Sequence, residues 1–225
     1  MATPRQAGAR ELPLRPERTR AETITGGGTT GNGLLTTATG AALLVLLAVL
    51  GVTILRIGQL LWLHLFLGML LIGPLALKLA STGYRFVGYY SGDPAYRRKG
   101  PPALLSRLLG PGVVLSTLIV FATGVALLFA GPSTRDELLP IHKITFFFWL
   151  AFIGLHVLLH LPSILPALRS DYGRDRVTSD VTGRSGRMLA LGGALVGGAV
   201  LAILVIPEFA PWVHASGSFH HHHHG

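Results

Sequence analysis

Five long apolar runs, almost free of charged residues, alternate with polar segments along the chain. A transmembrane helix needs about 20 mostly apolar residues. The runs lack the alternation of barrel strands, and a backbone in lipid must satisfy its own hydrogen bonds. We therefore expect an all-α fold, an integral membrane helical bundle of five transmembrane helices, at about residues 34–55, 58–82, 111–131, 139–165 and 187–207.

The composition strengthens this expectation and removes several classes of function. Apolar residues make up 50% of the 225 residues and charged residues 13%, whereas charged residues make up about 25% of an ordinary soluble domain. This balance excludes a water-soluble globule and a disordered chain. The absence of cysteine excludes disulfides, thiolate zinc sites, iron–sulfur clusters and cysteine nucleophiles.

The basic residues fall on one side of the membrane if the five spans alternate in direction. Of nineteen Lys and Arg residues, fifteen lie before the first span, after the second span or after the fourth. The positive-inside rule then predicts a plasma-membrane protein with a cytoplasmic N-terminus and an external C-terminus. This topology accounts for the formal charge of +9. No nucleic-acid-binding motif accompanies the charge, so we expect no nucleic-acid partner.

Outside the spans the sequence predicts little regular structure. The first span begins too far from Met1 for a secretory signal, so we expect an uncleaved anchor. The histidines at residues 220–224 are typical of an expression tag, with a native metal-binding tail as the alternative. The expected units are a disordered cytoplasmic tail and linker (1–33), a four-helix bundle (34–165), a cytoplasmic basic loop (166–186), the fifth helix (187–207) and an outer tail (208–225).

Four histidines lie in or beside the apolar spans, where ionisable residues are costly and are functional candidates. His64 and His142 lie near the outer ends of two spans that run in the same direction, so their depths are comparable. His156 follows His142 by fourteen residues, which places it within about 40° of the same helix face and about 21 Å deeper. His160 is one turn further on. Facing imidazoles at one depth suit the two axial ligands of a haem.

This pattern resembles the membrane b-type cytochromes, the di-haem four-helix superfamily that includes cytochrome b subunits of hydrogenases and formate dehydrogenases. The segment from Ser81 to Pro102 also resembles a loop of actinobacterial membrane proteins in this group. The resemblance covers about residues 34–165 and implies paired histidines, four turns apart, on the second and fourth helices. His142 and His156 match on the fourth span, and His64 matches on the second. Lys78 stands where the second helix should carry its other histidine.

One haem b, with its iron ligated by His64 and His142, is the expected cofactor in the outer half of the bundle. Three alternatives stay open for the inner half. The inner site is lost, or a second haem is ligated by His156 or His160 with Lys78 or nothing opposite. In the third alternative, Lys78 and the two inner histidines form a polar relay without haem.

Several glycines lie where close approach would be useful. Gly51 and Gly124 are at the depth of the expected outer haem, and Gly68 is one turn from His64. Ordinary helix packing is the alternative explanation for all three. In the fifth span, small-xxx-small spacing predicts close packing with the bundle or with another copy of the chain in a homo-oligomer, at Gly192, Gly193, Gly197 and Gly198.

The expected function is electron transfer through bis-histidine haem, between a quinol or cytoplasmic donor and a partner redox subunit. No dinucleotide fingerprint or strand pattern is evident, so a self-sufficient reductase is not expected. The other expected partner is membrane lipid, beside the basic residues 97–99. The alternative functions are a small proton- or metal-linked transporter that uses the intramembrane His and Lys residues, and a cofactor-free membrane assembly protein.

Overall fold

The structure, a computed structural model, describes residues 27–98, 104–172 and 182–218. The predictions for residues 1–26, for residues 173–181 of the expected loop and for the terminal histidines lie outside the described residues. Seven α-helices and two short 3-10 helices make up the described chain: α2 (Gly28–Leu55), α3 (Ile57–Tyr90), α4 (Pro94–Arg98), α5 (Leu104–Ala130), η1 (Pro132–Thr134), α6 (Arg135–Tyr172), α7 (Arg184–Leu204), η2 (Ile206–Phe209) and α8 (Ala210–Ser218).

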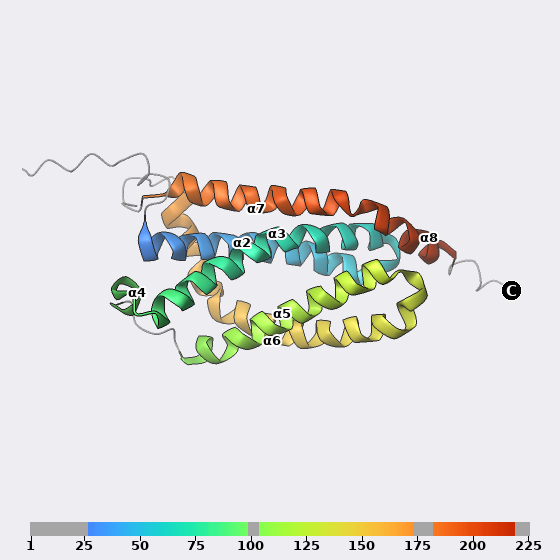
Figure 1. The fold of residues 1–225 in the computed structure, drawn as a ribbon, viewed down its shortest axis with the longest axis horizontal. Helices are drawn as coiled ribbons and strands as arrows, with labels where there is room; N and C mark the ends of the chain where they lie inside the picture. Colours follow the sequence, from blue (N-terminus) through green and yellow to red (C-terminus); the bar gives the residue numbers. More distant parts are fainter. Residues whose placement is uncertain (1–26, 99–103, 173–181, 219–225) are drawn as a thin grey trace, which may run out of the picture.

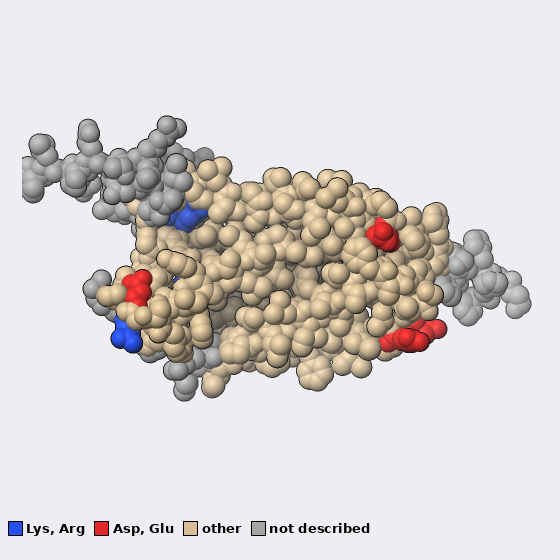
Figure 2. Space-filling model, viewed as in Figure 1, with Lys and Arg blue, Asp and Glu red and all other residues tan. Residues whose placement is uncertain are grey.

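The predicted fold class is confirmed. Within the described residues, five helices are long and apolar enough to cross a membrane: Gly28–Leu55, Ile57–Tyr90, Leu108–Ala130, Pro132–Pro162 and Arg184–Leu204. Large apolar side chains along these helices are exposed, including Val45, Phe147 and Leu189, as expected of surfaces that face lipid. Figure 2 shows charged side chains at the two ends of the molecule and an uncharged belt between them. The chain is a multi-pass membrane protein by these criteria.

The helices begin and end differently from the predicted spans. α2 starts at Gly28, inside the segment expected to be a linker, and α6 runs on to Tyr172, into the expected loop. A tertiary contact holds the first turns of α2, because Asn32 Nδ2 donates to the Ser81 carbonyl of α3 at 3.0 Å. Sequence composition shows a Gly- and Thr-rich stretch but does not show such a contact.

The spans are arranged in two groups (Figure 1). α2, α3 and α7 pack along one another, and α5 and α6 form a hairpin on the other side of α2 and α3. Direct contacts between the groups run mainly through α2 and α6. α7 packs mainly against α3.

α3 and α7 approach most closely where two glycines face each other. A Cβ added to Gly198 would overlap the Leu70 carbonyl, and one added to Gly73 would overlap the Ala194 carbonyl. Pro74, inside α3, lacks the N–H that would bond the carbonyl four residues earlier. The Leu70 carbonyl therefore has no partner of this kind within its own helix and lies against the Gly198 backbone. Of the four glycines singled out in α7, the other three would meet nothing within 4 Å.

A compact apolar cluster closes the end of the bundle where α3 begins and α7 ends. It contains Met69, Leu128, Ala202, Phe209 and Trp212, which are each at most 8% exposed. Trp212 Nε1 donates to the Leu128 carbonyl at 3.1 Å, so the segment after α7 joins α7 to the α5–α6 hairpin. The expected outer tail is thus partly helical and packed.

The glycine contact between α3 and α7 can be tested with two neighbouring substitutions. Gly198→Ala should lower the free energy of unfolding by about 1–3 kcal/mol, because the added methyl group forces the helices apart. Gly197→Ala should change it by less than about 1 kcal/mol, because that site is open and Ala favours helix. Unfolding in detergent, followed by circular dichroism, measures both. Equal effects of the two substitutions would contradict the contact.

Candidate functional site

His64 lies near the start of α3 and is held by a threonine of α2. Its Nδ1 is 2.9 Å from Thr53 Oγ1, and Thr53 is 1% exposed. Thr53 Oγ1 also donates to the Leu50 carbonyl at 2.6 Å. A hydroxyl has one proton. With that proton on the Leu50 carbonyl, Oγ1 accepts from an N–H at Nδ1 of His64, and the free electron pair of the imidazole is then on Nε2.

His142, near the start of α6, is held in the same way by a threonine of α5. Its Nδ1 is 3.1 Å from Thr123 Oγ1, which donates to the Val120 carbonyl at 3.0 Å. Thr145 adds a contact, with its Oγ1 3.1 Å from that of Thr123 and donating to the His142 carbonyl at 3.0 Å. With the Thr123 proton on the Val120 carbonyl, the N–H of His142 is on Nδ1 and its free electron pair is on Nε2.

Gly124 gives the His142 ring its place against α5. A Cβ at this position would come within 3.0 Å of His142 Cε1, so a larger residue would push the ring away from the helix. By contrast, a Cβ at Gly51 or Gly68 would meet nothing within 4 Å. Of the three glycines at this depth, Gly124 therefore contacts the His142 ring, whereas Gly51 and Gly68 border open space.

The two imidazoles come from the two helix groups and lie at the same end of the bundle. They are near enough for a charge on His142 to act on His64. Yet α3 and α6 are not among the described helix pairs that pack closely. Among the described residues, the Val120 backbone is a further hydrogen-bond partner of the His142 ring. With an N–H on each Nδ1, each imidazole has one nitrogen electron pair on Nε2.

Lys78 lies deeper in the bundle and is bound to α2. Its Nζ donates to the Thr36 carbonyl at 2.6 Å, and a Cβ at Gly40 would come within 3.0 Å of that Nζ. Ser81 Oγ donates to the Lys78 carbonyl and accepts from Thr36 Oγ1, both at 3.0 Å. These bonds make a polar link between α2 and α3.

His156 and His160 stack on each other along α6. Their ring centroids are 4.4 Å apart with 27° between the planes, and His160 Nδ1 is 2.9 Å from the His156 carbonyl. Lys78 is near enough for its charge to act on His156. The structure thus brings together the three inner residues that the sequence singled out, and it directs the amine of Lys78 to a carbonyl of α2.

Sequence reasoning missed the three threonines that hold the outer imidazoles. Thr53, Thr123 and Thr145 are isolated polar residues in apolar helices, and each bonds a carbonyl of its own helix, which is the ordinary behaviour of threonine in such helices. Only the rotation of each helix about its axis, set by packing, shows that two of them also meet a histidine.

The residues at the outer pair fit a haem better than a bare metal ion. Among the described residues, no group of three or more His, Asp or Glu side chains could hold a metal ion. Two imidazoles alone would leave a transition metal short of ligands. A haem brings four nitrogens and needs only two more from protein, on opposite faces. The outer pair offers two imidazoles from separate helix groups, which is the number of ligands that a haem needs from protein.

No protein-family model, curated protein or solved structure matches this chain.

Proposed function

We propose that this chain is a membrane b-type cytochrome, which carries electrons through one haem b held by His64 and His142. The observation that carries the proposal is the shared geometry of the two imidazoles. The Nδ1 of each lies within hydrogen-bond distance of a threonine hydroxyl on the adjacent helix, and with the threonine protons on carbonyls Nδ1 is the donor and Nε2 is left for a ligand. Metal-binding histidines characteristically have such a partner on the second nitrogen, which fixes the ring and raises its basicity.

The chain's own groups supply orientation and a dry environment for the cofactor. The threonine bonds hold the rings, and Gly124 seats one of them on α5. The apolar cluster around Phe209 and Trp212 closes this end of the bundle. Haem supplies a reversible one-electron change at iron, whose potential depends on ligands, hydrogen bonding and burial.

The inner residues favour a single haem over two. Lys78 would have to be neutral and turned toward α6 to serve as a ligand opposite His156. Its Nζ instead donates to the Thr36 carbonyl of α2, in a network that includes Ser81. We therefore assign Lys78 and the stacked histidines to the polar link between helices. A quinol or a cytoplasmic protein as donor, and a separate redox subunit as partner, complete the proposal.

The haem proposal predicts a pigmented protein. Detergent-purified wild type from haem-replete cells should show a Soret band and a reduced α-band, and His64→Ala or His142→Ala should remove most of both, because each removes an axial ligand. Absorbance spectra and the haem-to-protein ratio measure the effect.

Two further histidines serve as controls for that experiment. His214→Ala, at an exposed position in α8, should keep the full spectrum, and His156→Ala should keep a ratio of about one haem per chain. If wild type holds about two haems per chain and His156→Ala holds one, a second haem ligated by His156 would be supported instead. A colourless wild type would instead favour a transporter or an assembly protein.

The threonine bonds predict a change in redox behaviour. Thr53→Val or Thr123→Val should weaken haem binding about tenfold and raise the reduction potential, because an imidazole that loses its acceptor becomes less basic and stabilises ferric iron less. Redox titration of the α-band measures the potential.

Thr37→Val is the control, since Thr37 also donates to a carbonyl of its own helix, four residues earlier rather than three, and meets no imidazole in the described structure. It should leave affinity and potential unchanged. If all three variants behave like wild type, the threonines do not hold the ligands.

We further propose that the plasma membrane is the location and that α2 and α7 begin on the cytoplasmic side. The support is the positive-inside rule, since Arg85, Arg97, Arg184 and Arg187 lie at that end of the bundle. A reporter inserted at Ser133, in η1 at the opposite end, should give an external signal. A cytoplasmic signal there would reverse the orientation.

A further inference from the structure

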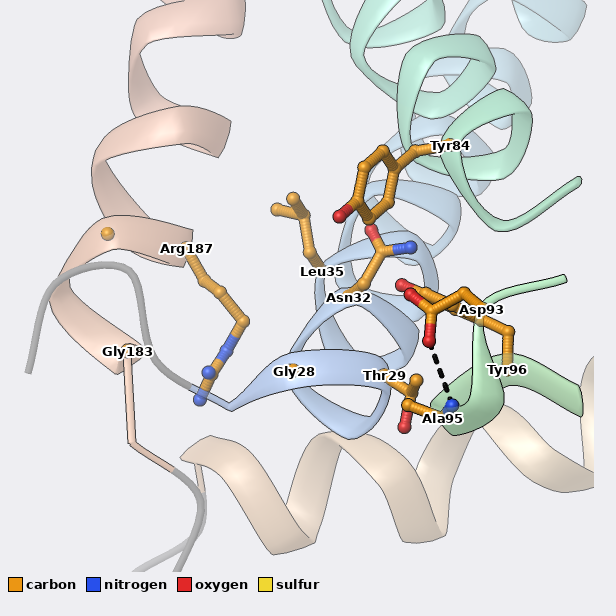
Figure 3. A pocket seen from close by; sticks show the side chains of 12 residues that line it. Gly28, Thr29, Asn32, Leu35, Tyr84, Asp93, Ala95, Tyr96, Gly183 and Arg187 are labelled. Atoms are coloured by element: carbon orange, nitrogen blue, oxygen red, sulfur yellow. Dashed lines mark hydrogen bonds between the residues drawn. The ribbon is translucent and has the colours of Figure 1, made fainter. Parts of the chain in front are cut away.

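A second site lies at the opposite end of the molecule from the two outer imidazoles. A cavity of about 500 Å³ opens between the first turns of α2, the end of α3, α4 and the start of α7 (Figure 3). Its polar lining residues are Thr29, Asn32, Tyr84, Asp93, Tyr96 and Arg187. Asn32 and Thr53 are 21 residues apart on α2, or about 31 Å, so this cavity is separate from the proposed haem site.

The cavity has one deeply buried cation. Arg187 is 5% exposed, and Figure 3 shows its side chain reaching from α7 toward the first turn of α2 beside Gly28. Its Nη1 donates to the Thr182 carbonyl at 2.8 Å, which fixes the side chain. A guanidinium has five N–H donors in a planar fork, the geometry that binds phosphate or carboxylate at two points.

Most of the other polar side chains around the cavity, those of Thr29, Asn32, Tyr84 and Tyr96, can donate hydrogen bonds as well as accept them. Tyr96 is 8% exposed, and burial raises the pKa of its hydroxyl, which therefore keeps its proton. The side chain of Asn32 is its hydrogen-bond partner, and Tyr84 packs edge-on against its ring. Asp93, the acidic residue of the lining, caps α4 by accepting from the Ala95 N–H at 2.8 Å. Because Asp93 is engaged at α4, Arg187 is the charged group of the lining that favours an anionic ligand.

Two helix starts add to this preference. α2 follows Gly27 and α7 follows Gly183, with no side-chain cap and no acidic residue in either first turn. Backbone N–H groups at a helix start lack partners within the helix, and they carry the positive end of the helix dipole. Both starts contribute residues to the lining, so their fields act on the same space as Arg187.

The surroundings of the cavity indicate the depth of lipid headgroups. α3 has 34 residues and is about 51 Å long, which exceeds the hydrocarbon thickness of about 30 Å. Its last turns carry exposed Tyr84, Phe86 and Tyr90, and aromatic residues of this kind gather at the membrane–water interface. The cavity therefore opens at the surface of the bilayer rather than in its core.

We propose that this cavity binds the phosphate of an anionic phospholipid, with Arg187 as the principal contact and the hydroxyl of Tyr96 as a further donor. Basic pockets between transmembrane helices on the cytoplasmic side are suited to such headgroups. The cavity volume is within the range of small-ligand pockets, about 300–1,000 Å³. The proposal does not depend on haem binding.

The test uses the full chain in mild detergent. Phosphatidylglycerol should raise the thermal unfolding temperature saturably, near one lipid per chain, and phosphatidylcholine should raise it less. Native mass spectrometry should detect the retained lipid. Arg187→Gln should weaken the apparent affinity for phosphatidylglycerol about tenfold, through the loss of a charged hydrogen-bonding group, and Tyr96→Phe should weaken it by a smaller factor.

Arg56→Gln, the same change of charge at an exposed position at the other end of the bundle, is the matched control and should keep the wild-type response. The haem absorbance of each variant reports separately on the outer site and should not change. Arg187→Gln with wild-type affinity would overturn the proposal. Stabilisation of the wild type by inorganic phosphate at the same concentrations would overturn the assignment to lipid and identify a soluble phosphate ligand.

Discussion

The arrangement of the outer histidines depends on where two hydroxyl protons go. Thr53 and Thr123 each direct their proton to a carbonyl of their own helix, and so each has only acceptor capacity left for the imidazole beside it. In a low-dielectric interior such bonds are strong and an unpaired N–H is costly. The two threonines thereby fix both the orientation of each ring and the nitrogen that stays available for a metal.

Helix packing brings each threonine to its histidine. Thr53 and His64 join α2 to α3, whereas Thr123 and His142 join α5 to α6, so each pair stabilises one helix hairpin. The hairpins can then meet with both imidazoles already oriented. In this sense each proposed ligand is oriented within its own half of the bundle.

Much of the fold could be predicted from the sequence, because a long apolar run in lipid has few alternatives to helix. The five spans followed from hydropathy, and the comparable depth of His64 and His142 followed from counting residues along parallel helices. Helix ends were less predictable, as α2 shows, because the Asn32 contact with Ser81 extends the helix into a Gly-rich stretch. The threonine partners and the seat at Gly124 depend on helix rotation, which periodicity in nearly uniform apolar runs does not determine.

The bond between Trp212 and the Leu128 carbonyl has a consequence for biosynthesis. A chain emerges from the ribosome with its N-terminus first, so both helix hairpins are complete before α8 has been made. The contact that joins α7 to the second hairpin is therefore among the last to form. Until then the apolar cluster around Phe209 and Trp212 is incomplete, and this end of the bundle stays open.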